Sequence, residues 1–324
     1  MRFSHVYVEN KARQYPLAEE ILKKNGDCSV IAIDHYKDVF DRPRQDTGLQ
    51  KRSPALILAV REGARIFKGA PVCQSFGQRN FYYSSSVMNC LFDCEYCYLR
   101  GMYPSSNIVV FVNFEDYAKD VKELLKEGPL YVCASYDTDL IALNGLTGLA
   151  DRWISLAEEN EGLLVELRTK AAPKELKNVQ NVIYAFTLSP DEIAKRYEKN
   201  VPSADDRIKA ASRALDNGCK VRLCFDPMIL TDNWEEVYGG FADHVARQMD
   251  FSKLTDVSVG CFRISKEYLS SMRKKCLDSG IAWYPYVIRN GVAQYEDDTD
   301  KKMQEFMRAR LARHIAEEKI FTWN

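Results

Sequence analysis

From about residue 81 onward, short apolar runs alternate with longer segments whose apolar residues recur every three or four positions. Seven of these runs have the length of strands: 83–89, 108–112, 130–134, 163–168, 182–188, 220–225 and 257–261. The periodic segments predict amphipathic helices at 114–126, 150–160, 205–217, 234–249 and 264–278. Strands that alternate with helices are typical of parallel βαβ units with right-handed crossovers. The pattern therefore predicts an α/β fold in which six or so such units form a full or partial barrel.

The two ends of the chain follow different patterns. Before residue 81, a short amphipathic helix is predicted at 15–25, strands at 29–33 and 55–60, and a polar loop at 41–53. Near the other end, a basic amphipathic helix is predicted at 301–318. Such a helix is typical of a solvated surface, and a DNA-facing role is the alternative. We therefore expect an N-terminal α/β lead-in region, a partial barrel and a C-terminal helical tail, at 1–80, 81–290 and 291–324.

Composition limits the classes of function. The 324 residues carry a formal net charge of −1, so any contact with nucleic acid has to come from a local basic patch. No apolar run is long enough to span a bilayer, and the first residues lack the apolar segment of a signal peptide. We therefore expect a cytoplasmic protein without a membrane partner, whose cysteines are kept reduced.

The segment 90–99 concentrates the chemistry of the chain. Cys90, Cys94 and Cys97 are separated by three and then two residues, so one loop can bring three thiolates to an iron–sulfur cluster. Such clusters are normally held by four thiolates, which leaves one iron open to another ligand. A zinc site with Cys94 and Cys97 as one ligand pair is the main alternative. Its other ligands would be a histidine or further cysteines, namely Cys28, Cys73 or Cys133.

That zinc site gives Cys90 no role. Buried structural cysteines are a weaker alternative, because Asp93 and Glu95 interrupt the segment. A disulfide framework does not suit the reducing setting.

Polar residues follow most of the predicted strands. In a barrel of parallel strands the chemistry sits at the carboxyl ends of the strands, so these residues are expected to surround the cysteine loop. They follow the third to the seventh predicted strand: Tyr136, Asp137, Asp139, Arg168, Thr169, Lys170, Thr187, Ser189, Asp226 and Arg263. For each residue alone, the alternative is a loop side chain that faces water.

Several segments resemble a known family. The matching segments are 7–17, 89–99, 137–141, 168–170, 218–227, 233–236 and 262–264. The cysteine spacing alone indicates only the radical S-adenosylmethionine superfamily, whereas the lead-in and the blocks at 96–99 and 234–236 are more specific. On these motifs the chain is similar to the spore photoproduct lyase family, which repairs ultraviolet-damaged thymines in spore DNA.

The resemblance implies a partial (β/α)6 TIM-like barrel of the radical S-adenosylmethionine type, together with two cofactors. The loop cysteines Cys90, Cys94 and Cys97 would hold a [4Fe–4S] cluster, and S-adenosylmethionine would bind its fourth iron. The residues expected to contact this cofactor are Lys170, Ser189 or Thr187, and Asp226.

The resemblance also implies the reaction and its partners. A deoxyadenosyl radical would take a hydrogen from the methylene bridge of the thymine dimer, the bridge would fragment, and a cysteine thiol would return a hydrogen. The substrate would be double-stranded DNA with its lesion flipped out, and the electron donor a flavodoxin or a ferredoxin. The setting would be the cytoplasm of a spore or germinating cell. Basic residues expected to contact phosphates are Arg263, Lys266, Arg273, Lys274, Lys275 and Arg289.

The chain departs from the family at the hydrogen donor. When the motifs are aligned, the donor cysteine of the family falls on Tyr136. We expect Cys73 to be the donor, with Cys133 as an alternative that the alternation of strand side chains disfavours. Tyr96 and Tyr98 match a radical relay that Tyr136 would extend. The departure leaves two other functions open: a radical enzyme of the same build acting on another substrate and, less favoured, a non-enzymatic zinc or DNA-binding protein.

Overall fold

The computed structural model describes residues 3–69 and 73–323. Within them the chain packs into two compact units, composed of Met1–Leu91 with Met102–Arg168 and of Phe92–Gly101 with Thr169–Asn324. The division passes through the cysteine loop, because Cys90 belongs to the first unit while Cys94 and Cys97 belong to the second. The predicted regions 1–80, 81–290 and 291–324 stay a prediction, because packing into units does not establish which stretches fold independently.

The first unit contains the strands of two sheets. These strands are β1 (Val6–Glu9), β2 (Val30–Ile33), β3 (Leu56–Ala59), β4 (Ile66–Lys68), β5 (Phe81–Ser84), β6 (Val87–Met88), β8 (Ile108–Phe111), β9 (Leu130–Cys133) and β10 (Leu163–Thr169). One sheet has the order β2-β1-β3-β8-β6. Its strands β2, β1, β3 and β8 are parallel, and the edge strand β6 is antiparallel to β8. The other strands have the order β10-β9-β5-β4, with β4 antiparallel. All residues of β3 and β8 are buried, as expected for parallel strands covered on both faces.

Some helices of the first unit begin or end at residues suited to that position. The helices of this unit are η1 (Asn10–Gln14), α1 (Pro16–Lys24), α2 (Lys37–Phe40), α3 (Thr47–Arg52), α5 (Phe114–Leu125), α6 (Leu140–Thr147) and α7 (Leu149–Glu158). Pro16 occupies the first turn of α1, where its missing N–H costs nothing. The Asp139 carboxylate accepts from the Ala142 N–H at 2.9 Å, and Gly148 ends α6 with a φ of 63°.

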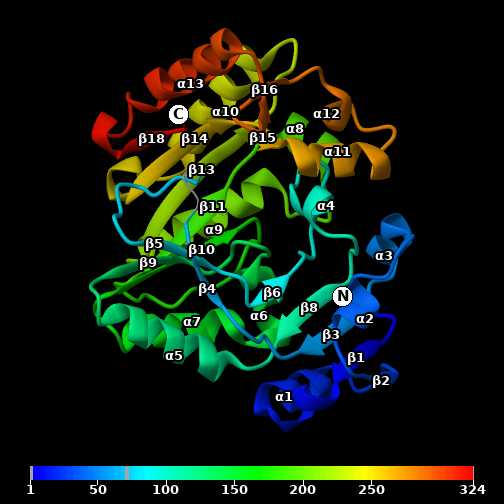
Figure 1. Ribbon diagram of the computed structural model, residues 1–324. Coiled ribbons are helices and arrows are strands. Elements are labelled where there is room, and N and C mark those ends of the chain that lie inside the picture. Colours follow the sequence, from blue (N-terminus) through cyan, green and yellow to red (C-terminus); the bar gives the residue numbers. More distant parts are fainter. Residues whose placement is uncertain (1–2, 70–72, 324) are drawn as a thin grey trace. The chain divides into compact units, whose positions relative to one another are not determined.

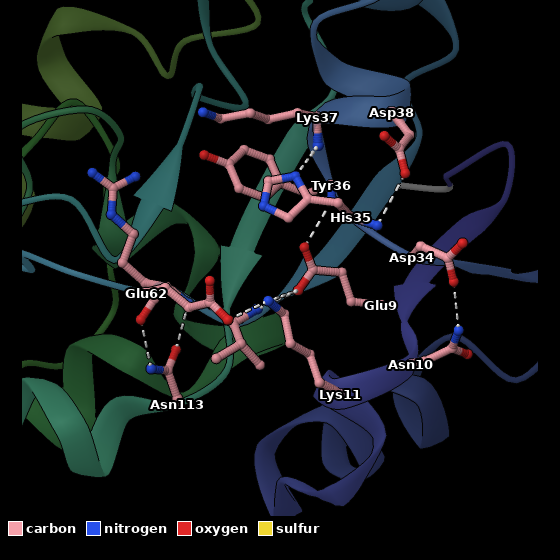
Figure 2. Close-up of polar contacts among 12 residues, drawn as sticks. Glu9, Asn10, Lys11, Asp34, His35, Tyr36, Lys37, Asp38, Glu62 and Asn113 are labelled. Carbon is pink, nitrogen blue, oxygen red and sulfur yellow. Dashed lines mark hydrogen bonds and ion pairs between the residues drawn. The ribbon is translucent and has the colours of Figure 1, made fainter.

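A buried carboxylate ties together the carboxyl ends of three parallel strands in the first unit (Figure 2). Glu9 ends β1 and is 0% exposed. Its oxygens accept from the backbone N–H of Tyr36 at 2.7 Å and of Val60 at 2.9 Å, in the segments after β2 and β3. The Lys11 ammonium lies 4.0 Å from Glu9 and 2.6 Å from Glu62. Because a buried charge is costly unless it is hydrogen-bonded or paired, these contacts allow Glu9 to join β2, β1 and β3.

The second unit is built on a parallel sheet with the order β18-β14-β13-β11. A small antiparallel sheet has the order β15-β17-β16, and β7 pairs with β12. The strands are β7 (Asp93–Cys94), β11 (Val182–Thr187), β12 (Glu198–Lys199), β13 (Lys220–Met228), β14 (Asp256–Cys261), β15 (Arg263–Ser265), β16 (Val287–Arg289), β17 (Val292–Gln294) and β18 (Ile320–Thr322).

The helices of the second unit include several that the sequence patterns had indicated. They are α8 (Asp191–Tyr197), α9 (Ala204–Asp216), α10 (Trp234–Gln248), η2 (Phe251–Lys253), α11 (Lys266–Lys275), α12 (Gly280–Trp283), α13 (Asp297–Leu311) and η3 (Glu317–Lys319), while α4 (Leu99–Met102) begins in this unit. Helix α13 packs against α10, β14 and β18 (Figure 1). In the part of the chain that the structure describes, no helix is both long and apolar enough to cross a membrane.

Most predicted strands and helices are confirmed, and four predictions are corrected. The strand predicted at 108–112 is β8, which pairs with β3 and β6 instead of joining β5 and β9, because an apolar run does not specify its partner. The strand predicted at 83–89 is divided between β5 and β6, which lie in different sheets. The loop predicted at 41–53 contains α3, which has no buried residue and therefore no apolar stripe. The tail helix ends at Leu311 instead of at 318.

Candidate active site

In the second unit, the cysteine loop is held by a short antiparallel ladder. Strands β7 and β12 set Cys94 opposite Glu198. The Arg100 guanidinium donates to the carbonyl of Cys94 at 2.9 Å and forms an ion pair with Asp93 at 2.5 Å. The Cys97 N–H donates to the carbonyl of Cys94 at 3.2 Å. Backbone hydrogen bonds and one arginine therefore fix the loop around these two cysteines.

A single buried carboxylate gathers the polar side chains behind this loop. Glu198 Oε1 accepts from Ser189 Oγ at 2.8 Å and lies 3.2 Å from Lys170 Nζ, and Oε2 accepts from Arg207 Nη2 at 2.8 Å. The Tyr96 hydroxyl donates to Glu198, and the Lys170 ammonium donates to the Tyr96 oxygen. The structure thus brings together three predicted site residues, Tyr96, Lys170 and Ser189. Glu198 and Arg207 complete the group and were missed from the sequence.

The charged side chains of this group stabilise one another in their ionised forms. Burial raises the pKa of Glu198, but the cations of Lys170 and Arg207 outweigh burial and hold that pKa at about 2. Burial lowers the pKa of Lys170, but Cys94, Tyr96 and Glu198 together raise it well above its ordinary value. At neutral pH the group therefore holds one carboxylate and two cations.

The same group affects the protonation of the Cys94 thiol. Burial raises the pKa of the Cys94 thiol to about 11, against the opposing effect of Lys170. Lys170 Nζ lies 3.8 Å from Cys94 Sγ. Because metal ligation requires the thiolate and a nearby cation stabilises it, this neighbourhood fits a cysteine that gives up its proton when a cluster binds.

Thr187 and Asp226 lie on the neighbouring strands β11 and β13, but β13 runs to Met228, past its predicted end at 225, so Asp226 lies within the strand. Asp226, in β13, accepts from the Ser258 hydroxyl and from Trp323 Nε1 at 3.1 Å. The Arg263 guanidinium lies over the Trp323 ring, 4.0 Å from its centre. Thr187 ends β11, and its carbonyl accepts from Arg207 at 2.9 Å. Thr187 is therefore joined to the Glu198 group through its backbone, while Asp226 belongs to a separate polar group.

In the first unit, Cys73 and Tyr136 lie together. The Cys73 sulfur is 3.4 Å from the Tyr136 hydroxyl oxygen. The Tyr136 ring stacks on Tyr83 with 4.2 Å between centroids, and Tyr83 stacks on Phe67 at 5.3 Å. Burial, reinforced by the neighbouring thiol, raises the pKa of Tyr136 above its ordinary value. The phenol therefore keeps its proton at neutral pH beside a thiol.

Cys133, the alternative donor, has different neighbours. Its sulfur lies 3.6 Å from Glu166 Oε1, and Glu166 also accepts from the Tyr131 hydroxyl and from Arg168 at 3.3 Å. Burial raises the pKa of Cys133 well above its ordinary value. Besides burial, Cys73 raises the pKa of Cys133, and Cys133 raises that of Tyr136, so the three groups lie close enough to affect one another. The choice between Cys73 and Cys133 as donor therefore stays a prediction.

Two carboxylates that follow β9 make contacts within the first unit. Asp137 is buried and accepts from the Tyr103 hydroxyl at 2.9 Å. Asp139 caps α6. These contacts give both residues a part in holding the segment after β9.

The remaining predicted site residues are Cys90 and Tyr98, one in each unit. Cys90 is half-buried, and its carbonyl accepts from Lys51 Nζ at 3.5 Å within the first unit. Tyr98 is half-buried in the second unit. Among the described residues the cysteines form no disulfide, and no group of three or more histidine, cysteine, aspartate or glutamate side chains is arranged to hold a metal ion. That Cys90, Cys94 and Cys97 share one cluster therefore stays a prediction.

Comparison with known proteins decides the family. A family model described as spore photoproduct lyase matches residues 2–322. The chain belongs to the spore photoproduct lyase family. A curated relative, the spore photoproduct lyase of Geobacillus sp. (strain Y412MC61), is 21% identical over 334 residues, which cover 95% of this chain and 94% of the relative.

Solved structures of the family confirm the fold class. A spore photoproduct lyase complexed with dinucleoside spore photoproduct aligns with a TM-score of 0.83 and 18% identity, over 99% of this chain and 98% of that one. A variant with bound AdoMet and dinucleoside spore photoproduct also gives 0.83, at 19% identity and the same coverage. The predicted partial barrel of the radical S-adenosylmethionine type is thus confirmed. Family membership also confirms the predicted enzyme class, a radical S-adenosylmethionine lyase, and its cofactors, S-adenosylmethionine and a [4Fe–4S] cluster.

Proposed function

We propose that this chain reverts spore photoproduct in DNA, 5-thyminyl-5,6-dihydrothymine, to two thymines. Family membership supports the reaction, and the solved relatives hold dinucleoside spore photoproduct and AdoMet. For the hydrogen-return step in this chain, the main support is the 3.4 Å contact between the Cys73 sulfur and the Tyr136 hydroxyl oxygen. A thiol beside a protonated phenol supplies the hydrogen that the second half of the repair requires.

The cofactors are assigned to residues that fit them. Cys90, Cys94 and Cys97 would hold the [4Fe–4S] cluster, and Lys170 beside Cys94 favours the thiolate that ligation needs. When bound, the cluster and S-adenosylmethionine would supply a deoxyadenosyl radical that takes a hydrogen atom from C6 of the dihydrothymine ring, not from the methylene bridge as the resemblance suggested. A radical at C6 is β to the bond between C5 and the bridge, so that bond can break to form the C5=C6 bond of one thymine and leave a methylene radical on the other. The protein contributes binding, orientation and exclusion of water.

The Glu198 group is suited to the carboxylate of S-adenosylmethionine. The ammonium of Lys170 would attract that carboxylate and Ser189 would lie beside it, while the Glu198 side chain, which is 0% exposed, holds both residues in place. Thr187 joins the same group through its backbone. Asp226 would face the cofactor from β13, held by Ser258 and Trp323.

Cys73 and Tyr136, both in the first unit, would return a hydrogen atom to the thymine radical. The Cys73 S–H bond breaks, one hydrogen atom passes to the thymine radical to form the C–H bond, and a thiyl radical remains on Cys73. The Tyr136 O–H then breaks to restore the S–H bond, which moves the unpaired electron to the phenol. Tyr96 and Tyr98 would continue this relay and bring back the hydrogen atom taken at the start. The protonated state of Tyr136 is required, because a phenolate has no hydrogen atom to give.

The partners and setting follow from the same reaction. The substrate would be double-stranded DNA with the thymine lesion flipped out of the stack, and a flavodoxin or ferredoxin would supply the electron. The protein would act in the cytoplasm of the spore or germinating cell.

One experiment tests this function. The protein, reconstituted with iron and sulfide without oxygen, is given reductant, S-adenosylmethionine and irradiated spore-type DNA, and released thymine and deoxyadenosine are measured. The wild type is expected to release thymine with little net deoxyadenosine, because the relay returns the hydrogen atom taken at the start. Cys73→Ala is expected to keep cofactor cleavage, lose thymine recovery and accumulate by-products. Thymine yields equal to those of the wild type would remove Cys73 from the mechanism, and no thymine from the wild type would favour a different substrate.

A further inference from the structure

Trp283, at the end of α12, is held firmly but left open to solvent. Its side chain is 53% exposed. The indole N–H donates to the carbonyl of Cys276 at 3.2 Å, and the Arg273 guanidinium lies 5.5 Å from the ring centre. Arg273 is itself fixed by hydrogen bonds to the carbonyls of Ala282 at 2.7 Å and Tyr284 at 3.2 Å. A large aromatic ring is therefore ordered before any partner arrives, which lowers the entropic cost of binding to it.

The segment that carries Trp283 is attached to the cysteine loop. The Ser279 hydroxyl, which caps α12, donates to the carboxylate of Glu95 at 2.6 Å. The Lys275 ammonium donates to the carbonyl of Arg100 at 3.0 Å, and Arg100 donates to the Cys276 sulfur at 3.5 Å. Both Glu95 and Arg100 belong to the loop that carries Cys94 and Cys97. The exposed indole therefore lies on a segment that contacts the cluster loop, within one unit.

The charge around Trp283 suits a polyanion. Residues 263–289 contain six basic and two acidic side chains, in a chain whose net charge is −1. Lys274 is exposed on the last turn of α11. Leu277, which is 73% exposed, adds apolar surface nearby in the sequence. Aromatic faces beside positive charge are the surfaces on which unpaired nucleobases stack.

Some of the residues expected to contact phosphates also have partners within the protein. Arg273 and Lys275 are engaged with backbone carbonyls, and Arg289 forms an ion pair with Asp297. Arg273 therefore supports the Trp283 ring from within the protein. Lys274 remains as an exposed basic residue of this stretch.

We propose that Trp283, supported by Arg273, is a stacking platform for a nucleobase that flanks the lesion. This inference rests on the proposed function and adds a contact beyond the lesion itself. Flipping a lesion out of a duplex leaves neighbouring bases without their normal stacking. A tryptophan face replaces that stacking for any base, because every base has a π-face. The platform would thereby hold the opened strand in place while repair proceeds.

Substrate length provides the first test. A dinucleoside lesion has no flanking base, whereas a lesion within a longer oligonucleotide does. In Trp283→Ala, the ratio of kcat/KM on the oligonucleotide to kcat/KM on the dinucleoside is expected to fall about tenfold, a typical size for the loss of one stacked base. Trp283→Phe should retain most of the ratio. Leu49→Ala, at a side chain 55% exposed on α3, is the matched control and should leave the ratio unchanged. An unchanged ratio in Trp283→Ala would overturn the platform.

Fluorescence provides a second test that does not depend on repair. The chain has four tryptophans, and Trp153 and Trp234 are 0% and 9% exposed. Adding oligothymidylate to the wild type is expected to quench the emission of Trp283. Trp283→Phe should bind the oligonucleotide, as followed by anisotropy of a label on the DNA, but lose this quenching. Equal quenching in both proteins would overturn the proposal, even if the chain repaired no lesion at all.

Discussion

The sulfur of Cys73 lies 3.4 Å from the hydroxyl oxygen of Tyr136, at the position where the family motif carries its donor cysteine. The two groups come from segments 63 residues apart, and stacking on Tyr83 holds the phenol in place. Under the proposed function, a donor thiol and the group that restores its hydrogen would thus be in contact before the substrate binds. The pairing would let a chain with tyrosine at this position keep a thiol for hydrogen return.

Tyr136→Phe is predicted to leave the first turnover normal and to slow the later ones. The variant keeps the ring that stacks on Tyr83 but loses the O–H that restores the Cys73 thiol. We expect a normal thymine yield in a single turnover and a steady-state rate about tenfold lower, which corresponds to a barrier about 1.4 kcal/mol higher. Rapid-quench measurement of thymine would show this burst. A steady-state rate equal to that of the wild type would exclude Tyr136 from the relay.

Cys133→Ala is predicted to leave the products of repair unchanged. The Cys133 sulfur contacts Glu166, whereas Cys73 contacts Tyr136. Removing a small buried side chain should cost about 1 kcal/mol of stability, because it leaves a cavity. Product analysis by chromatography beside Cys73→Ala measures the difference. By-products from the Cys133 variant would reassign the donor to this strand.

Local pattern and motif spacing predicted a good part of this site. Periodicity placed the strands that end near Lys170, Thr187 and Asp226, and the cysteine spacing marked the loop. The period of two along a strand favoured Cys73 over Cys133 as donor, which stays a prediction. Each of these features depends on residues close together in the chain.

Contacts between distant segments could not be predicted in this way. Glu198 lies in a two-residue strand with no motif of its own, so its role appears only when β12 pairs with β7. For Arg207 the sequence does contain an indication, because this residue lies on the same buried face of α9 as Ala211 and Leu215. An arginine on an apolar helix face indicates a buried acidic partner, but the sequence does not say which one.

Glu198→Gln is predicted to destabilise the fold in a pH-dependent manner. Lys170 and Arg207 lower the pKa of Glu198 from 4.5 to about 2 despite its burial. Its ionised form therefore stabilises the protein fully above pH 4.5, and this stabilisation is lost as the pH falls from 4.5 through 2. At pH 7 we expect the free energy of unfolding to fall by about 3 kcal/mol, because two buried cations lose their partner.

Urea unfolding of both proteins between pH 7 and pH 3 measures this effect. The difference between wild type and Glu198→Gln should shrink as the pH falls below 4.5. Glu123→Gln removes an exposed carboxylate paired with Lys126 and serves as the control, with little expected effect at any pH. A constant difference from pH 7 to pH 3 would mean that Glu198 stabilises the fold by shape and hydrogen bonding instead of charge.

Gly260→Ala is predicted to disturb Asp226 through Trp323. Gly260 lies in β14, and a Cβ atom there would overlap the Trp323 indole. The indole donates to Asp226 at 3.1 Å and lies under the Arg263 guanidinium. Moving the ring should cost about 1–3 kcal/mol of stability, as overpacking does elsewhere. It should also weaken S-adenosylmethionine binding, because Asp226 loses the donor that orients it.

Calorimetric titration of the reconstituted protein with S-adenosylmethionine measures the second effect. Gly145→Ala in α6 is the matched control, since nothing lies within 4 Å of a Cβ atom there, and alanine favours a helix. Asp226→Asn should weaken binding in the same direction as Gly260→Ala, because both act on one carboxylate. A destabilised Gly260→Ala protein that binds the cofactor as tightly as the wild type would place Asp226 outside the cofactor site, and the pair with Trp323 would then serve only to fasten β18 to the sheet.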